Sequence, residues 1–168
     1  MLGPMPASTV SASLLDDLER KLREEIPLAR AMDLRVADYD GQALTLAAPL
    51  PPNINDKGCA FGGSLASLMT LAGWGLVRLQ LQARGSDADV YVADSSIRYL
   101  APVWGDFGAI ARPVEGESFD AFFETLLARG RARIGIVCEV PLPDGTAAAS
   151  LAARFVAIDP ARARGAAS

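Results

Sequence analysis

The residues best placed for chemistry form one polar, glycine-containing run directly before a long uncharged segment. The run reads Asn53-Ile54-Asn55-Asp56-Lys57-Gly58-Cys59-Ala60-Phe61-Gly62-Gly63-Ser64. The first N–H groups of a helix have no partner within the helix, and its dipole favours negative charge there. Because glycine lets a carbonyl group approach closely, Gly62 and Gly63 predict an oxyanion site at a helix N-terminus. The alternative is a turn that needs glycine only for a sharp entry into the helix.

Three polar residues near these glycines each have a catalytic and a structural interpretation. Asp56 could act as general base for a water molecule, or it could cap the loop or helix by accepting backbone N–H bonds. Asn55 could orient the water or the substrate, or it could form an Asx turn. Thr70 lies two turns into the expected helix, where its hydroxyl could bind water or substrate or donate to an upstream carbonyl. The residues alone leave these alternatives open.

Cys59 precedes the same helix terminus, where a thiolate would be stabilised. The sequence contains no histidine that could activate it as a nucleophile. We therefore interpret Cys59 as a small buried residue.

The first half of the chain predicts the elements that position this run. Apolar spacing over residues 13–32 predicts an amphipathic helix, with Ser13 and Asp16 as a capping box and a break at Pro27. Asp40-Gly41 predicts a hairpin between strands at 34–39 and 42–48. Residues 59–77 carry no charge, but glycine, serine and threonine make them too polar for a membrane span. They predict a buried helix over 62–84.

The second half predicts strands at 88–100, 107–113, 131–141 and 147–158, and a short helix at 118–129 that ends at Gly130. This order predicts a single α+β domain, with one long helix packed against a curved, mainly antiparallel sheet. We place the domain at residues 13–158, after a disordered lead-in at 1–12 and before a flexible tail at 159–168.

The composition of the chain argues against several classes of binding partner. The net charge is −4 and the sixteen lysine and arginine residues are scattered, which argues against nucleic acid. The two cysteines have neither metal-ligand spacing nor the pattern of a disulfide framework. With no export signal visible, we expect a cytoplasmic protein without a membrane span and without a metal.

The glycine run resembles a known motif. Asn55, Gly58, Phe61, Gly62 and Gly63 match the Asn-x-x-Gly-x-x-His-Gly-Gly signature of phenylacetyl-CoA-type hot-dog acyl thioesterases, with Phe61 in place of the histidine. Residues 51–75 together with 95–103 resemble more closely the YiiD C-terminal, thioesterase-like family. The resemblance implies a hot-dog fold, in which a curved sheet wraps a long central helix, here with an extra N-terminal helix. Thr70 stands where the phenylacetyl-CoA-type enzymes often carry the catalytic Asp or Glu.

The resemblance implies an enzyme that hydrolyses an acyl-CoA or acyl-carrier-protein thioester, with coenzyme A only as part of the substrate and no other cofactor. The absence of histidine argues against the related hydratases and dehydratases. We expect Asn55, Asp56, Gly62, Gly63 and Thr70 to form the catalytic site. Substrate contacts are expected at Phe61, Ser64, Arg131 and Arg133, although the two arginines could equally lie on an ordinary exposed strand face.

Hot-dog domains build each active site between two subunits, so the resemblance also implies a homodimer or a dimer of dimers. Two alternatives to an enzyme remain open. The chain could be a non-catalytic module that binds acyl thioesters, or a partner domain of a separate acetyltransferase.

Overall fold

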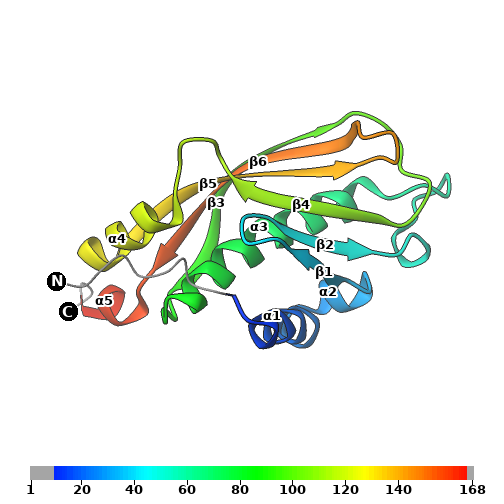
Figure 1. Cartoon of the computed structure of the whole chain (residues 1–168). Coiled ribbons are helices and arrows are strands. Elements are labelled where there is room, and N and C mark those ends of the chain that lie inside the picture. The colour runs from blue at the N-terminus through cyan, green and yellow to red at the C-terminus, as the bar shows by residue number, and fades with distance from the viewer. Residues whose placement is uncertain (1–9, 166–168) are drawn as a thin grey trace.

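The computed structural model describes residues 10–165 (Figure 1). The predicted lead-in at 1–12 lies mostly outside this range. The described chain begins with helices α1 (Ala12–Glu25) and α2 (Pro27–Ala31), which are separated at Ile26 as the proline predicted. The N-cap of helix α1 lies two residues earlier than predicted. It is Ser11, whose Oγ accepts from the Leu14 amide at 3.3 Å. The capping box at Ser13 and Asp16 was therefore wrong, since Ser13 already lies inside the first turn.

Six strands form one sheet in the order β1-β2-β4-β5-β6-β3, and every neighbouring pair is antiparallel. Their bounds are β1 (Arg35–Tyr39), β2 (Leu44–Ala48), β3 (Asp89–Tyr99), β4 (Phe107–Pro113), β5 (Arg131–Pro141) and β6 (Ala147–Ile158). The predicted strands thus all form. The hairpin between β1 and β2 turns at Asp40, whose Oδ1 accepts from the Gln42 and Ala43 amides, and at Gly41 with φ +97°.

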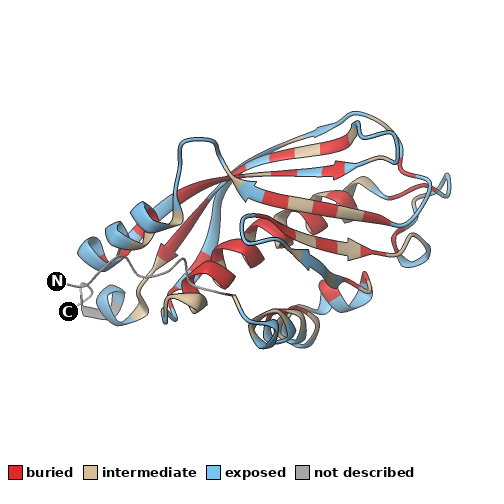
Figure 2. Cartoon of the chain, in the orientation of Figure 1, coloured by how far each residue is buried: buried red, intermediate tan, exposed pale blue. Residues whose placement is uncertain are grey.

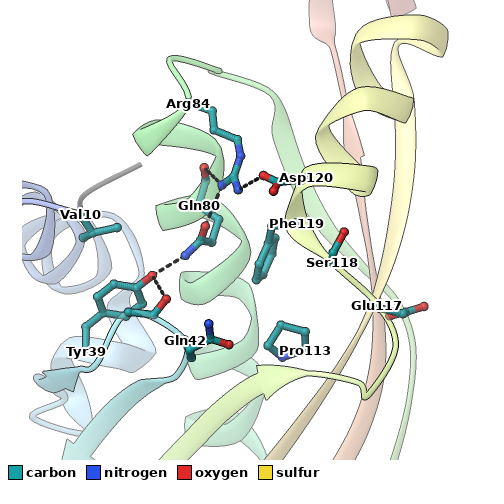
Figure 3. Close-up of a pocket in the computed structure, with 11 residues that line it drawn as sticks. Val10, Tyr39, Gln42, Gln80, Arg84, Pro113, Glu117, Ser118, Phe119 and Asp120 are labelled. Carbon is teal, nitrogen blue, oxygen red and sulfur yellow. Dashed lines mark hydrogen bonds and ion pairs between the residues drawn. The ribbon is translucent and has the colours of Figure 1, made fainter. Parts of the chain in front are cut away.

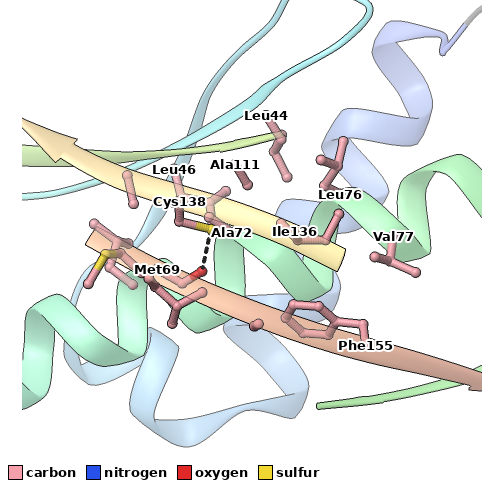
Figure 4. Packing of buried hydrophobic residues seen from close by; sticks show 14 of the residues in the cluster. Leu44, Leu46, Met69, Ala72, Leu76, Val77, Ala111, Ile136, Cys138 and Phe155 are labelled. Carbon is pink, nitrogen blue, oxygen red and sulfur yellow. Dashed lines mark hydrogen bonds between the residues drawn. The ribbon is translucent and has the colours of Figure 1, made fainter. Parts of the chain in front are cut away.

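Helix α3 (Gly62–Ala83) runs along the concave side of this sheet, as Figure 1 shows. The 22-residue helix is about 33 Å long at 1.5 Å per residue. Its side chains pack against β5, β6 and β2. Figure 4 shows part of this buried cluster, with Met69, Ala72 and Leu76 of α3, Leu44 of β2, Ile136 of β5 and Phe155 of β6. Figure 2 shows buried residues along α3 and on the strands that face it. The buried helix and the α+β class are therefore confirmed.

The sheet has a long exposed edge at β3. This 11-residue strand pairs only with β6 within the described chain. Nine of its residues are exposed, among them Tyr91, Val92 and Tyr99, which are 46–56% accessible. An edge of this length with apolar side chains is a surface on which another strand can pair.

Two shorter helices complete the fold. Helix α4 (Phe119–Arg129) begins at the N-cap Ser118 and ends at Gly130, which has φ +73° as its C-cap position requires. Helix α5 (Pro160–Gly165) lies within the segment predicted to be a flexible tail. Its Arg162 donates to the Leu127 and Ala128 carbonyls at 2.9 and 3.3 Å, at the end of α4. Within residues 10–165, no helix is both long and apolar enough to cross a membrane.

Candidate active site

The predicted glycine run forms a compact loop before α3. After a short 3₁₀ turn, η1 (Pro51–Asn53), the loop folds back on itself through a bridge between Ile54 and Ala60. The Asn55 amide donates to the Cys59 carbonyl at 2.8 Å. Gly58 has φ +89°, which a residue with a side chain rarely adopts, so glycine is needed at this turn.

Asn53 fastens this loop to the rest of the domain. Its side chain is only 2% exposed, and its Nδ2 donates to the Met32 and Pro49 carbonyls at 2.9 and 2.7 Å. The backbone carbonyl of Asn53 accepts from the Phe61 amide at 2.8 Å. Through its side chain and its backbone, Asn53 therefore links the end of α2, the loop and the residue that precedes α3. Sequence reasoning missed this role, because Asn53 reads as one more polar loop residue.

The start of α3 presents two free donors. The Phe61 carbonyl accepts from the Ser64 and Leu65 amides at 2.9 and 3.1 Å, while no side chain caps the helix. Within the described residues, the amides of Gly62 and Gly63 make no hydrogen bond. Two unpartnered N–H groups at the positive end of a 22-residue helix are suited to a carbonyl oxygen on which negative charge develops.

Aromatic rings flank both glycines. The Tyr99 hydroxyl donates to the Gly62 carbonyl at 3.3 Å, and a Cβ placed on Gly62 would lie 3.4 Å from the Tyr99 ring. A Cβ on Gly63 would lie 2.8 Å from Cζ of Phe61. Tyr99 was not among the predicted site residues. The available signal was its place in residues 95–103, the second run that carried the family resemblance.

The two runs that carry the resemblance meet at this point. The Ala60 amide donates to the Val103 carbonyl at 2.8 Å, so the chain just before α3 lies beside the chain that follows β3. Large apolar side chains remain exposed in these two segments, between 52 and 63% accessible: Ile54, Phe61, Tyr99, Leu100 and Trp104. An exposed apolar cluster of this kind is typical of a surface that binds a partner or an apolar ligand.

In the part of the chain that the structure describes, the side chains of Asn55 and Asp56 make their contacts within the loop and not with Gly62 or Gly63. Asn55 has the contacts of an Asx turn: its Oδ1 accepts from the Lys57 and Cys59 amides at 2.8 and 3.2 Å. The Asp56 carboxylate is 81% exposed and pairs with Lys57 at 3.0 Å. Neither side chain hydrogen-bonds to Gly62 or Gly63 within the described residues.

Helix residues of the predicted site have structural contacts. The Thr70 hydroxyl donates to the Ala66 carbonyl at 2.8 Å, which is the back-bonding alternative described above. Ser64 is half-buried in the first turn. Cys59 is 6% exposed, in agreement with its interpretation as a small buried residue.

Arg131 and Arg133 lie far from the glycines of the same chain. They are exposed on β5, opposite Ile158 and Val156 at the end of β6, whereas the start of β6 lies near the loop through bonds from Leu100 and Ala101 to Ala148. About nine strand residues, or about 30 Å, separate the two ends. Their alternation with buried Ala132 also places them on the face turned away from α3.

A hollow of about 540 Å³ lies at the opposite end of α3 (Figure 3). Gln80, Arg84 and Asp120 line it and bond to one another: Arg84 donates to Gln80 Oε1 and to Asp120 Oδ1 at 2.7 and 2.8 Å. Gln80 Nε2 in turn donates to the hydroxyl of Tyr39, whose pKa is raised by burial. These groups satisfy one another, and a helix C-terminus offers no free N–H group. We therefore place the candidate site at the glycines and not in this hollow.

Comparison with known proteins identifies the family of the chain. The family described as "Putative thioesterase (yiiD_Cterm)" matches residues 15–159, which include the loop, α3 and the whole sheet. The chain belongs to this YiiD C-terminal family. The family resemblance of the two sequence runs is thereby confirmed.

Solved structures support the same assignment. A protein of unknown function from Chlorobaculum tepidum is 30% identical, with a TM-score of 0.83 over 90% of this chain and 98% of that one. A "putative thioesterase" from Shewanella oneidensis is 32% identical, with a TM-score of 0.78 over 88% and 99%. A thioesterase from Haemophilus influenzae, 14% identical with a TM-score of 0.67 over 87% and 92%, shares the fold. The YiiD C-terminal chain thus has the hot-dog fold with an added N-terminal helix.

Proposed function

We propose that this chain hydrolyses an acyl-CoA or acyl-carrier-protein thioester at the N-terminus of α3. The observation that carries the proposal is the pair of free amides at Gly62 and Gly63, flanked by the rings of Phe61 and Tyr99. Because the chain belongs to a family described as a putative thioesterase, we propose that the carbonyl bound by these donors is that of a thioester. The exposed apolar cluster around them suits an acyl chain.

The chemistry follows from the two donors. The thioester oxygen accepts from the Gly62 and Gly63 amides, which polarise the carbonyl and stabilise the tetrahedral intermediate formed by water. The carbon–sulfur bond then breaks, and the thiol leaves with the free acid as the other product. Asp56 is proposed as the base that takes the water's proton, because a carboxylate can accept it. Asn55 and Thr70 are proposed to orient the water, since neither side chain is a base at neutral pH.

We further propose a homodimer through the β3 edge. The 11 residues of β3 leave one side of the strand unpaired within the described chain, and its exposed apolar side chains adjoin the cluster at Tyr99 and Leu100. Antiparallel pairing of two β3 strands would place the start of the partner's strand beside the end of this one. Coenzyme A contacts by Arg131 and Arg133 are proposed in this arrangement, since both lie at the level where β3 starts.

A non-catalytic acyl-thioester binding module is the second candidate. It is favoured by the exposure of Asp56 and by the contacts of Thr70, which bonds to its own helix. Such a module would bind a thioester without releasing free thiol. A partner domain of a separate acetyltransferase would likewise release no thiol.

Release of free thiol from a panel of acyl-CoA and acyl-carrier-protein substrates separates these functions. The sharpest variant is Gly62→Pro, which deletes one donor where proline is tolerated, at the first helical position after an extended residue. Gly62→Ala is its matched control, because it adds a Cβ beside Tyr99 and keeps the amide. We expect turnover of Gly62→Pro to fall about 10²–10³-fold below that of Gly62→Ala. Equal turnover of the two variants, or no thiol release by the unmodified protein, contradicts the proposal.

A further inference from the structure

The ring of Phe61 lies beside the free amide of Gly63. In an α-helix the Cα–Cβ bond tilts toward the N-terminus, so the missing Cβ of Gly63 points toward the place where an oxygen would meet the free amides. Phe61 fills that direction: its Cζ and Cδ1 lie 2.8 and 3.1 Å from the position of such a Cβ. A carbonyl oxygen that accepts from these amides would therefore lie beside the Phe61 ring.

The backbone of Phe61 is fixed by hydrogen bonds, whereas its side chain is exposed to solvent. Its amide donates to the Asn53 carbonyl at 2.8 Å, and its carbonyl accepts from Ser64 and Leu65. The side chain is nevertheless 55% exposed, although the residue is large and apolar. One edge of the ring, from Cδ1 to Cζ, lies beside Gly63. Because the backbone of Phe61 is fixed, its half-exposed ring borders the site at a defined position.

A second aromatic ring, that of Tyr99, lies beside the other glycine of the pair, Gly62. Tyr99 lies against Gly62, with its ring 3.4 Å from the position of a Cβ there and its hydroxyl on the Gly62 carbonyl. A carbonyl that reaches the two amides thus enters between two rings. The carbon bonded to that carbonyl is confined with it, whereas more distant carbons of the acyl chain are not.

We propose that Phe61 determines specificity by limiting the width of the acyl group directly beside the thioester carbon. This rests on the proposed thioesterase function of the same glycines. Acyl groups that are unbranched next to the carbonyl fit between the rings. Isomers with a methyl group on that carbon meet the Phe61 ring and react more slowly.

The test compares substrates of equal size. The straight-chain acyl-CoA that the protein cleaves best is paired with its isomer that carries a methyl group next to the carbonyl, butyryl-CoA and isobutyryl-CoA being the shortest such pair. The kcat/KM ratio of straight to branched substrate is measured by thiol release. Phe61→Ala and Phe61→Leu are compared with Leu127→Ala, a control on α4 at a similarly exposed apolar residue.

We expect the unmodified protein to favour the straight-chain isomer by about tenfold or more, the discrimination that one methyl group supports in a fitted pocket. Phe61→Ala should bring the ratio close to one and Phe61→Leu should lower it, while Leu127→Ala should leave it unchanged. An unchanged ratio in both Phe61 variants, with thiol still released, overturns the specificity role alone. Absence of thiol release by the unmodified protein from every substrate overturns the proposed function, and this role with it.

Discussion

A side chain at Gly73 would have to enter a close contact between α3 and the sheet. An added Cβ would lie 2.8 Å from both Cε2 and Cζ of Phe155 and 3.4 Å from Cγ2 of Ile136. Both neighbours are fully buried, with 0% of their surfaces exposed, so neither ring nor methyl group can swing into solvent. Gly73→Val should therefore overpack the core.

The expected cost follows from two opposing effects. Overpacking costs about 1–3 kcal/mol, and valine adds two methyl groups beyond the Cβ that already collides, which favours the upper part of that range. Replacing a helical glycine by valine returns only a few tenths of a kcal/mol in helix propensity, roughly 0.3. The net loss of unfolding free energy is then about 2 kcal/mol, which lowers the Tm by about 4–8 °C for a domain of this size.

Urea unfolding at one fixed protein concentration measures this loss, because dimerisation would make the apparent stability depend on concentration. Gly75→Ala is the control. Its Cβ would lie 3.1 and 3.4 Å from methyl carbons of Leu44 and Leu18, against 2.8 Å for Gly73 and Phe155. These methyl groups need to move by only a few tenths of an ångström, so we expect a change within about 1 kcal/mol. Adding Phe155→Leu to Gly73→Val should recover part of the loss through coupling. An unchanged urea midpoint for Gly73→Val would refute the packing described for this face of α3.

Three further outcomes are expected. Asp56→Asn should lower kcat about 10²–10⁴-fold if the carboxylate is the base, and Thr70→Ala should lower it less; full activity of the first with loss in the second would reverse the assignment. Burial raises the pKa of the Cys138 thiol from 9.0 to about 12, so the unfolded chain loses this proton first and stability falls as the pH rises from 9 toward 12. Between pH 8 and 10, unfolding free energy should drop about 1 kcal/mol more in the unmodified protein than in Cys138→Ala; parallel curves would contradict this. Light scattering at micromolar concentration should give a dimer mass, and a monomer mass would count against a site shared through β3.

Elements with local chemical signals were predicted correctly. The Asp40-Gly41 turn, the end of α4 at Gly130 and the break at Pro27 all appear where expected, because each depends on the backbone freedom or side-chain bonds of one or two residues. The start of α1 shows the limit of this reasoning. Ser11 and Ser13 are both good N-cap residues, and only the folded chain selects between them.

The sheet order required tertiary information. Strand β3 precedes β4 in the chain, yet β3 occupies the far edge beside β6, and β4 pairs between β2 and β5. No local pattern encodes this arrangement, since the alternation of side chains fixes a face but not a neighbour. Tyr99 was missed for the same reason: its contact with Gly62 spans 37 residues and exists only because β3 ends beside the start of α3.

Asp56 shows that a residue close to Gly62 in sequence can lie on a differently oriented part of the loop. Only six positions separate it from Gly62, yet the loop reverses between Ile54 and Ala60, with Gly58 at a positive φ. This reversal brings Asn53 and Phe61 together through a 2.8 Å hydrogen bond and leaves residue 56 at the exposed tip. The loop that leads to the two free amides therefore leaves Asp56, the acidic residue nearest to them in sequence, exposed to solvent. If Asp56 is the base, the water or a second subunit must bridge that separation, which is why Asp56→Asn and the mass of the assembly test one mechanism together.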